Sequence, residues 1–184
     1  MYTTSSHTSS IPVCEYIENY VDIPTFSKAC RVCPNYGQIW SCPPYDFDVM
    51  NYWKNYSTLQ LYAEKIIFSR KYTARTYEQD ELSELIQKVI GKEKQRLSQK
   101  MLELEQLFPG SISLSAGNCS YCGSGCTRPN GIPCRYPGQM RYSIESLGGN
   151  VGMTIEKLMG LKLEWMEEGH LPHHFVLVNG LIIP

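Results

Sequence analysis

The sequence predicts a single α+β (mixed α/β) domain in which a small mixed β-sheet is covered by helices. One long stretch shows the apolar spacing of a helix, and short β-prone apolar segments lie on both sides of it. Two tight groups of cysteines also predict two cysteine-rich metal-binding loops. At 184 residues the chain is long enough to bury one sizeable core.

The N-terminal residues 1–12 are rich in Ser and Thr, and we expect them to form a flexible tail. Residues 13–184 are then the single cysteine-rich metal-binding domain. Neither a basic start followed by an apolar core nor an apolar run of about 20 residues is present. These features predict a cytoplasmic protein.

The first cysteine loop, residues 24–45, contains four prolines and a glycine, which disfavour a regular helix or a central strand. Asp46 and Asp48 then stand where a helix N-cap is expected, and apolar residues recur at helical spacing as far as Tyr62. The apolar, β-prone segment 65–72 predicts a buried strand.

Residues 78–108 carry two apolar stripes at helical spacing, with Gly91 as a possible break between them. Pro109 and Gly110 end this helix, and the alternation in residues 111–117 predicts a strand that leads to Cys119. A strand, a helical crossover and a second strand indicate a mixed sheet. Further on we expect helices over 139–147 and 154–159 and strands over 161–166 and 174–183.

Eight cysteines exceed what packing requires in a chain of this size. Clustered cysteines in a reducing compartment indicate metal or redox chemistry, whereas a secreted chain would use them in disulfides. The absence of a signal sequence and the long cysteine-free stretch between the two groups favour metal binding.

The second cysteine loop, residues 119–134, carries four cysteines in the pattern Cys-x2-Cys-x3-Cys-x7-Cys: Cys119, Cys122, Cys126 and Cys134. Four thiolates complete the coordination of either zinc or an iron-sulfur cluster. Structural zinc usually takes paired Cys-x2-4-Cys knuckles from separate hairpins, whereas closely spaced cysteines followed by a more distant one favour an iron-sulfur cluster, [4Fe-4S].

The first cysteine loop supplies three thiols, from Cys30, Cys33 and Cys42. Cys14, sixteen residues upstream of Cys30, is one candidate for the fourth ligand. Otherwise a histidine, a carboxylate, water or a substrate must complete the shell, and a position held by water or a substrate is what a catalytic centre needs. Both interpretations stay open at the level of sequence.

Positive charge accompanies both cysteine groups. Lys28 and Arg31 lie in the first loop, three arginines lie between residues 119 and 144, and neither stretch contains an acidic residue. These cations suit centres in which thiolates and sulfides carry negative charge. The net charge of −1 indicates neither nucleic acid nor a membrane surface as a partner.

Several blocks give the sequence a family resemblance: Cys30-x2-Cys33-Pro34-Asn35-Tyr36-Gly37, Trp40-Ser41-Cys42-Pro43-Pro44-Tyr45, Ala116-Gly117-Asn118-Cys119-x2-Cys122, Pro133-Cys134-Arg135-Tyr136-Pro137 and Ser143-Ile144-Glu145-Ser146-Leu147-Gly148. They resemble a family of uncharacterised bacterial and archaeal predicted metal-binding proteins, over about residues 28–183. The resemblance implies that the seven cysteines of the two loops bind metal. Cys14 has no counterpart in the family pattern.

These patterns together predict a metal-binding protein with one or two iron-sulfur clusters that acts in electron transfer or in a reductive reaction. Its partner would be a redox protein or a small-molecule substrate. The alternative is a zinc-stabilised structural or binding module without redox activity. The sequence identifies no catalytic residue and leaves open whether the protein is an enzyme.

Overall fold

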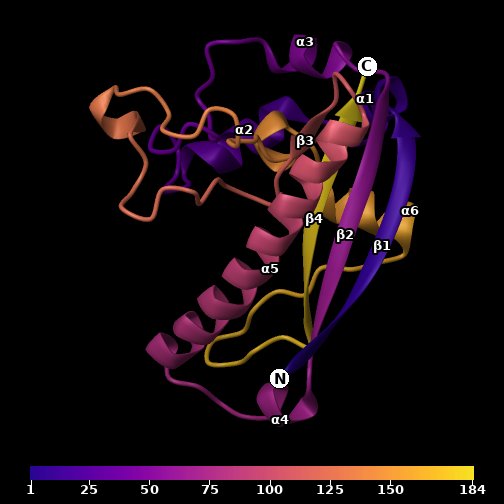
Figure 1. Cartoon of the computed structure of the whole chain (residues 1–184). Helices are drawn as coiled ribbons and strands as arrows, with labels where there is room; N and C mark the ends of the chain where they lie inside the picture. The colour runs from indigo at the N-terminus through magenta and orange to yellow at the C-terminus, as the bar shows by residue number, and fades with distance from the viewer.

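The computed structural model describes residues 1–184 and confirms the α+β class, with a four-stranded sheet in the order β1-β2-β4-β3 (Figure 1). All three strand pairings are antiparallel, so the expectation of a mixed sheet is wrong. The elements in chain order are β1 (Tyr2–Pro12), α1 (Val13–Tyr20), α2 (Ile23–Arg31), α3 (Val49–Lys54), β2 (Thr58–Phe68), α4 (Arg70–Thr73), α5 (Gln79–Leu107), β3 (Ile112–Leu114), η1 (Arg128–Asn130), η2 (Glu145–Leu147), α6 (Val151–Met159) and β4 (His174–Ile183).

Strand β1 corrects the prediction of a flexible tail over residues 1–12. It pairs with β2 along its whole length, from Tyr2 opposite Phe68 to Pro12 opposite Thr58. The Tyr2 hydroxyl donates to Glu93 of α5 at 2.7 Å, which also fastens the start of the strand. Because β1 is an edge strand, its backbone pairing and polar contacts hold it without the apolar alternation that marks a half-buried strand. The domain therefore does not begin at residue 13.

Strand β2 also differs from the prediction. The helix expected from residue 49 to Tyr62 ends at Lys54, and Leu59 and Leu61 belong to β2. Their spacing of two residues places both on one face of a strand, where both are fully buried. Residues 65–72 accordingly divide between the end of β2 and α4.

Helix α5 covers one face of the sheet and runs for 29 residues without a break at Gly91 (Figure 1). Its apolar side packs against Ile66 and Phe68 of β2 in a cluster that includes Leu82 and Val89. Polar contacts continue the interface, since Arg96 of α5 pairs with Glu64 of β2 at 2.8 Å. The predicted helix over 78–108 is confirmed.

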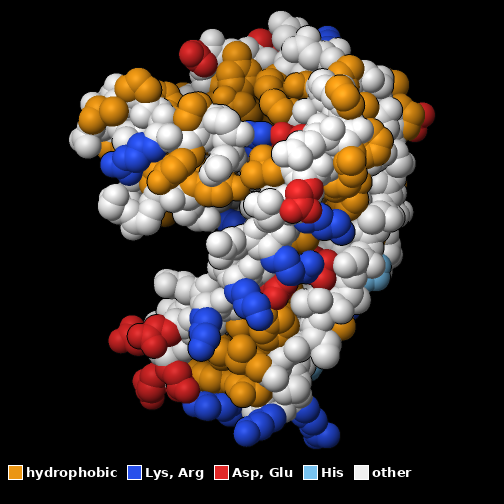
Figure 2. Space-filling view, in the orientation of Figure 1, with side chains coloured by type: hydrophobic (Ala, Val, Ile, Leu, Met, Phe, Trp, Pro, Cys, Tyr) orange, Lys and Arg blue, Asp and Glu red, His pale blue; other side chains and the backbone are white.

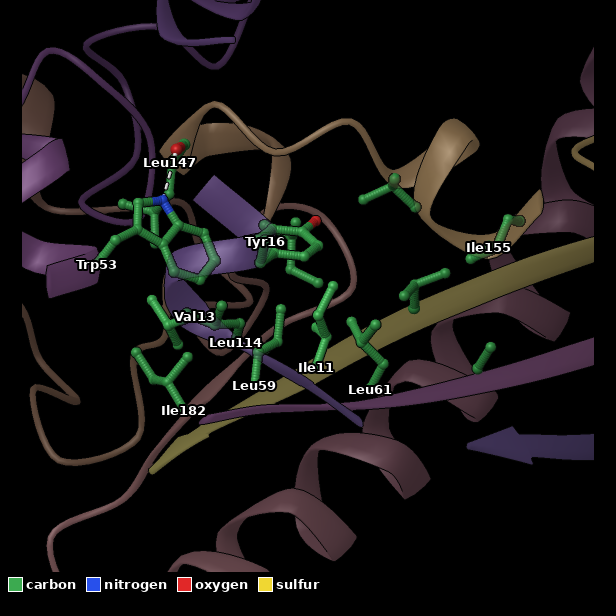
Figure 3. Close-up of a cluster of buried hydrophobic side chains, with 14 of the residues drawn as sticks. Ile11, Val13, Tyr16, Trp53, Leu59, Leu61, Leu114, Leu147, Ile155 and Ile182 are labelled. Carbon is green, nitrogen blue, oxygen red and sulfur yellow. Dashed lines mark hydrogen bonds between the residues drawn. The ribbon is translucent and has the colours of Figure 1, made fainter. Parts of the chain in front are cut away.

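The main hydrophobic core lies on the other face of the sheet, under α1, α3 and α6 (Figure 3). Tyr16 and Trp53 are fully buried there. The Tyr16 hydroxyl lies 2.9 Å from that of Thr154, and Trp53 Nε1 donates to the Leu147 carbonyl at 2.9 Å. These bonds satisfy the polar atoms of the two large side chains and connect α1 and α3 to the C-terminal segments.

The C-terminal third agrees with the prediction only in part. Strand β4 over 174–183 and strand β3 within 111–117 are confirmed, and α6 includes the helix expected at 154–159. Of the helix expected over 139–147 only the 3-10 turn η2 forms, and residues 161–166 form no strand. No helix of the structure combines the length and apolar character needed to cross a membrane.

Candidate metal centre

The first cysteine loop begins on a helix, which corrects the prediction of an irregular segment from residue 24. Helix α2 starts at Ile23, with the Asp22 carboxylate accepting from the Thr25 amide at 3.0 Å, and carries Cys30 in its last turn. Pro24 is tolerated because it occupies the first turn, where its missing N–H would be unpaired in any case. Cys33 follows in a turn in which its amide donates to the Cys30 carbonyl at 3.0 Å.

Cys42 is positioned by the folding of the loop upon itself. The Gly37 amide donates to the Pro43 carbonyl at 2.8 Å, and the Cys42 amide to that of Ile39 at 3.0 Å. Gly37 adopts a φ of +69°, a conformation that residues with a Cβ rarely take. The turn therefore brings Cys42 back toward Cys30 and Cys33.

The second cysteine loop contains little regular structure beyond η1. Thr127 is its buried centre, since its hydroxyl donates to the Pro133 carbonyl at 3.0 Å and its carbonyl accepts from the Asn130 and Ile132 amides. Arg135 donates to the Gly125 carbonyl at 2.9 Å. These contacts draw the segment that carries Cys134 toward the one that carries Cys122 and Cys126.

The two cysteine loops pack directly against each other, away from the main core (Figure 1). The Cys119 amide donates to the Ser41 hydroxyl at 2.9 Å. Arg128 of η1 donates to the backbone carbonyls of Ile39, at 2.8 Å, and of Cys42 and Pro44. The structure thus joins two segments that lie almost 80 residues apart.

Trp40 completes this interface between the loops. Its indole N–H donates to the Ile132 carbonyl at 3.1 Å, and the Arg128 guanidinium lies 5.2 Å from the ring centroid. Such a cation–π contact stabilises the pair by about 0.5–1 kcal/mol at an exposed site. Trp40 therefore fixes the second loop on the first.

The thiols within each group influence one another electrostatically. Burial raises the pKa of the Cys42 thiol, and the charges of Cys33 and Cys30 raise it further. Burial likewise raises the pKa of Cys119, with further contributions from the other three cysteines of its loop. The raised pKa values mean that deprotonating these thiols is unfavourable. Since metals bind the thiolate, a metal ion would have to offset this cost by direct ligation.

All eight cysteines are free thiols, and no three His, Cys, Asp or Glu side chains are arranged as metal ligands. The second loop has room for its thiols to rearrange around a metal, because a Cβ added at Gly123, Gly125 or Gly131 would meet no heavy atom within 4 Å. As a donor set, four soft thiols in an adjustable loop fit zinc or an iron-sulfur cluster.

Cys14 lies apart from this arrangement. It occupies the exposed side of α1, whose buried residues are Val13 and Tyr16. It is also absent from the groups that shift the pKa of Cys30, namely burial, Cys33 and Glu145. The structure gives no support to Cys14 as the fourth ligand of the first group.

Two further residues beside the cysteines could not be assigned from sequence. Lys94 of α5 donates to the Asn118 carbonyl at 3.1 Å. Burial lowers its pKa, against the opposing charges of Glu145 and of two thiols, Cys119 and Cys42. The Lys94 ammonium thus interacts electrostatically with a thiol of each cysteine group. Only the packing of α5 places it beside these thiols.

Glu145 is half-buried, and one of its carboxylate oxygens, Oε2, is buried without a hydrogen-bond partner. Burial raises its pKa, and its charge in turn acts on Cys30 and Lys94. Glu145 forms no ion pair with Arg135 or Arg141, the two arginines that precede it most closely in the sequence. Arg141 instead pairs with Glu105 of α5, with Nε donating to Oε1 at 2.7 Å.

Comparison with protein families settles the affiliation. The family model described as "Predicted metal-binding protein (DUF2284)" matches residues 17–183. The chain belongs to this family. All seven cysteines of the two loops lie inside the matched range, whereas Cys14 lies outside it. No curated protein and no solved structure matches the chain significantly. Membership in DUF2284 supports metal binding and identifies neither the metal nor a reaction.

Proposed function

We propose that this DUF2284 protein is an iron-sulfur protein that acts in electron transfer or in a reductive reaction. Cys119, Cys122, Cys126 and Cys134 would hold a [4Fe-4S] cluster, since four thiolates complete the shell of a cubane. Cys30, Cys33 and Cys42 would hold a second metal centre.

The observation that carries this proposal is the packing of the two cysteine loops against each other through Ser41, Trp40 and Arg128. A structural zinc site needs only to order its own loop. Here two separate thiol groups share one interface and one neighbouring cation, Lys94, which suits two centres that exchange electrons. Basic groups near a cluster also raise its reduction potential.

The first group supports the reductive reaction specifically. It has three thiols, with Cys14 outside the site, and a cavity of about 190 Å³ lined by Cys30 and Tyr36 adjoins it. Three protein ligands leave one position for an exogenous ligand or a substrate. We therefore place the reaction at this group and electron supply at the second.

The test is the composition and spectrum of protein purified without oxygen. We expect brown protein that contains iron and acid-labile sulfide, with a broad absorbance near ~400 nm. Colourless protein with stoichiometric zinc and no sulfide would refute the proposal and establish a zinc-stabilised module instead.

A second measurement tests the division between the two groups. Cyanide or imidazole should perturb only part of the iron spectrum, and Cys14→Ala should leave the metal content intact. If Cys14→Ala instead empties the first site, both centres are closed by protein thiols, and a pure electron carrier becomes the better interpretation.

A further inference from the structure

A cavity of about 460 Å³ lies between the middle of α5 and the start of the second cysteine loop, within the usual size range of small-molecule sites. Figure 2 shows the hollowed surface beside α5 below the lobe of the cysteine loops. Four of the lining residues carry the argument: Lys94, Cys119, Arg141 and Asn179.

The lining is polar and its net charge is positive. Only four of the 15 lining residues are hydrophobic, and none is acidic. Arg141 is neutralised by its ion pair with Glu105. Lys94 donates to a single acceptor, the Asn118 carbonyl, although an ammonium group has three N–H donors. Lys94 is thus the cation available to a ligand, and a carboxylate would satisfy its remaining donors.

Glu145 acts on Lys94 electrostatically, and its charge opposes the lowering of the Lys94 pKa by burial. The two side chains form no ion pair or hydrogen bond, and Glu145 lines a second cavity that Lys94 also borders rather than this one. Glu145 therefore leaves the remaining N–H donors of Lys94 to a ligand.

Asn179 adds a second requirement on the ligand. It is only 2 % exposed, and its Nδ2 donates to the Leu114 carbonyl at 3.2 Å. Its Oδ1 is buried without a partner, which is unfavourable unless a donor reaches it. Asn179 lies on the face of β4 toward α5, because its partner in the ladder is Tyr62, and the Tyr62 ring lies beneath Lys100 of α5. A hydroxyl or amide N–H of a bound molecule would supply the missing bond.

We propose that this cavity binds a small hydroxylated carboxylate, with the carboxylate on Lys94 and the hydroxyl donating to Asn179 Oδ1. Cys119 lines the same cavity, so the molecule would lie beside the second cysteine group. This inference rests on the proposed function in one respect only, which is that the neighbouring second cysteine group holds a metal. A single available cation favours a carboxylate over the more highly charged phosphate group.

Isothermal titration calorimetry on protein purified without oxygen tests this inference with matched probes. L-lactate and L-malate should bind, whereas propionate, which lacks the hydroxyl, and lactamide, which lacks the charge, should bind about tenfold more weakly or worse. Lys94→Met and Asn179→Leu should each weaken lactate and malate binding by about tenfold or more. Lys88→Met, which removes an exposed lysine of α5 outside the cavity, is the control and should leave binding unchanged.

The outcomes separate this inference from the proposed function, because iron and sulfide are measured on the same samples. Iron-loaded protein that binds neither lactate nor malate would overturn the inference alone. Equal affinity for propionate, or unchanged affinity in both Lys94→Met and Asn179→Leu, would also overturn it. Protein without iron that binds both hydroxy acids through Lys94 and Asn179 would support the cavity and refute the cluster.

Discussion

Replacing Arg128 with alanine should release the second cysteine loop from the first. The guanidinium donates to the carbonyls of Ile39, Cys42 and Pro44 and lies over the Trp40 ring. A hydrogen bond from a charged group contributes about 1.5–3 kcal/mol when buried. Because Arg128 is only half-buried, we take about 1 kcal/mol for each of the three bonds, which gives about 3 kcal/mol in all.

This free energy corresponds to about a hundredfold change in the opening equilibrium of the interface. Native-state hydrogen exchange measures it at the Cys119 amide, whose partner is the Ser41 hydroxyl across the interface. Protection of this amide should fall by about a hundredfold in Arg128→Ala, or should be lost completely if the interface itself is less stable than this. The metal content should fall with it, because both cysteine groups depend on this contact.

Arg135→Ala is the matched control. Arg135 is an exposed arginine that directly follows the same loop, and its bond to the Gly125 carbonyl does not reach the first loop. It should change the protection of the Cys119 amide little. Equal protection in Arg128→Ala and Arg135→Ala would refute the claim that Arg128 holds the two loops together.

Three further perturbations test the core and the ligands. Cys122→Ser should lower the metal content and the melting temperature, because ligation supplies folding free energy to an irregular loop, and unchanged values would show that Cys122 is no ligand. Gly149→Ala should reduce the free energy of unfolding by about 1–3 kcal/mol, since its Cβ would lie 3.0 Å from the Ile144 carbonyl and the Tyr16 hydroxyl. Gly138→Ala, with no atom within 4 Å of the added Cβ, is its control in urea denaturation, and equal values would contradict the packing argument. Burial alone would raise the pKa of Glu105, but bonds from Arg141 and Ser113 hold it below its usual 4.5. The stabilisation that these bonds give the folded state is therefore present above pH 4.5 and lost as the pH falls through the folded-state pKa. Glu105→Gln should be less stable at pH 7, and its free energy of unfolding should fall less steeply with acid in a pH–stability profile.

The sequence by itself determined the features that depend on local pattern. The stripe of apolar residues over 78–108 specifies α5, and the apolar run over 174–183 specifies β4, because each pattern buries one side of a single element. The spacing of the cysteines in each loop likewise brings thiols of one group together over a few residues. The family match over 17–183 covers the stretch that contains these seven cysteines and does not test them one by one.

The tertiary structure alone decided the features that depend on distant partners. Residues 2–12 become a strand because β2 offers them an unpaired edge, a partner that their own polar sequence does not reveal. Leu59 continues the helical spacing of the apolar residues before it, whereas Leu59 and Leu61 together have the spacing of a strand. The packing of β2 between β1 and β4 selects the strand.

The candidate site follows the same division. Ser41 and Cys119, or Arg128 and Pro44, lie about 80 residues apart, and only the folded chain joins them. Lys94 reaches the cysteines because α5 packs across the sheet, and Asn179 faces the cavity because of its register with Tyr62. Local spacing therefore selected the groups that can ligate a metal, whereas long-range packing decided which charges and polar atoms surround them.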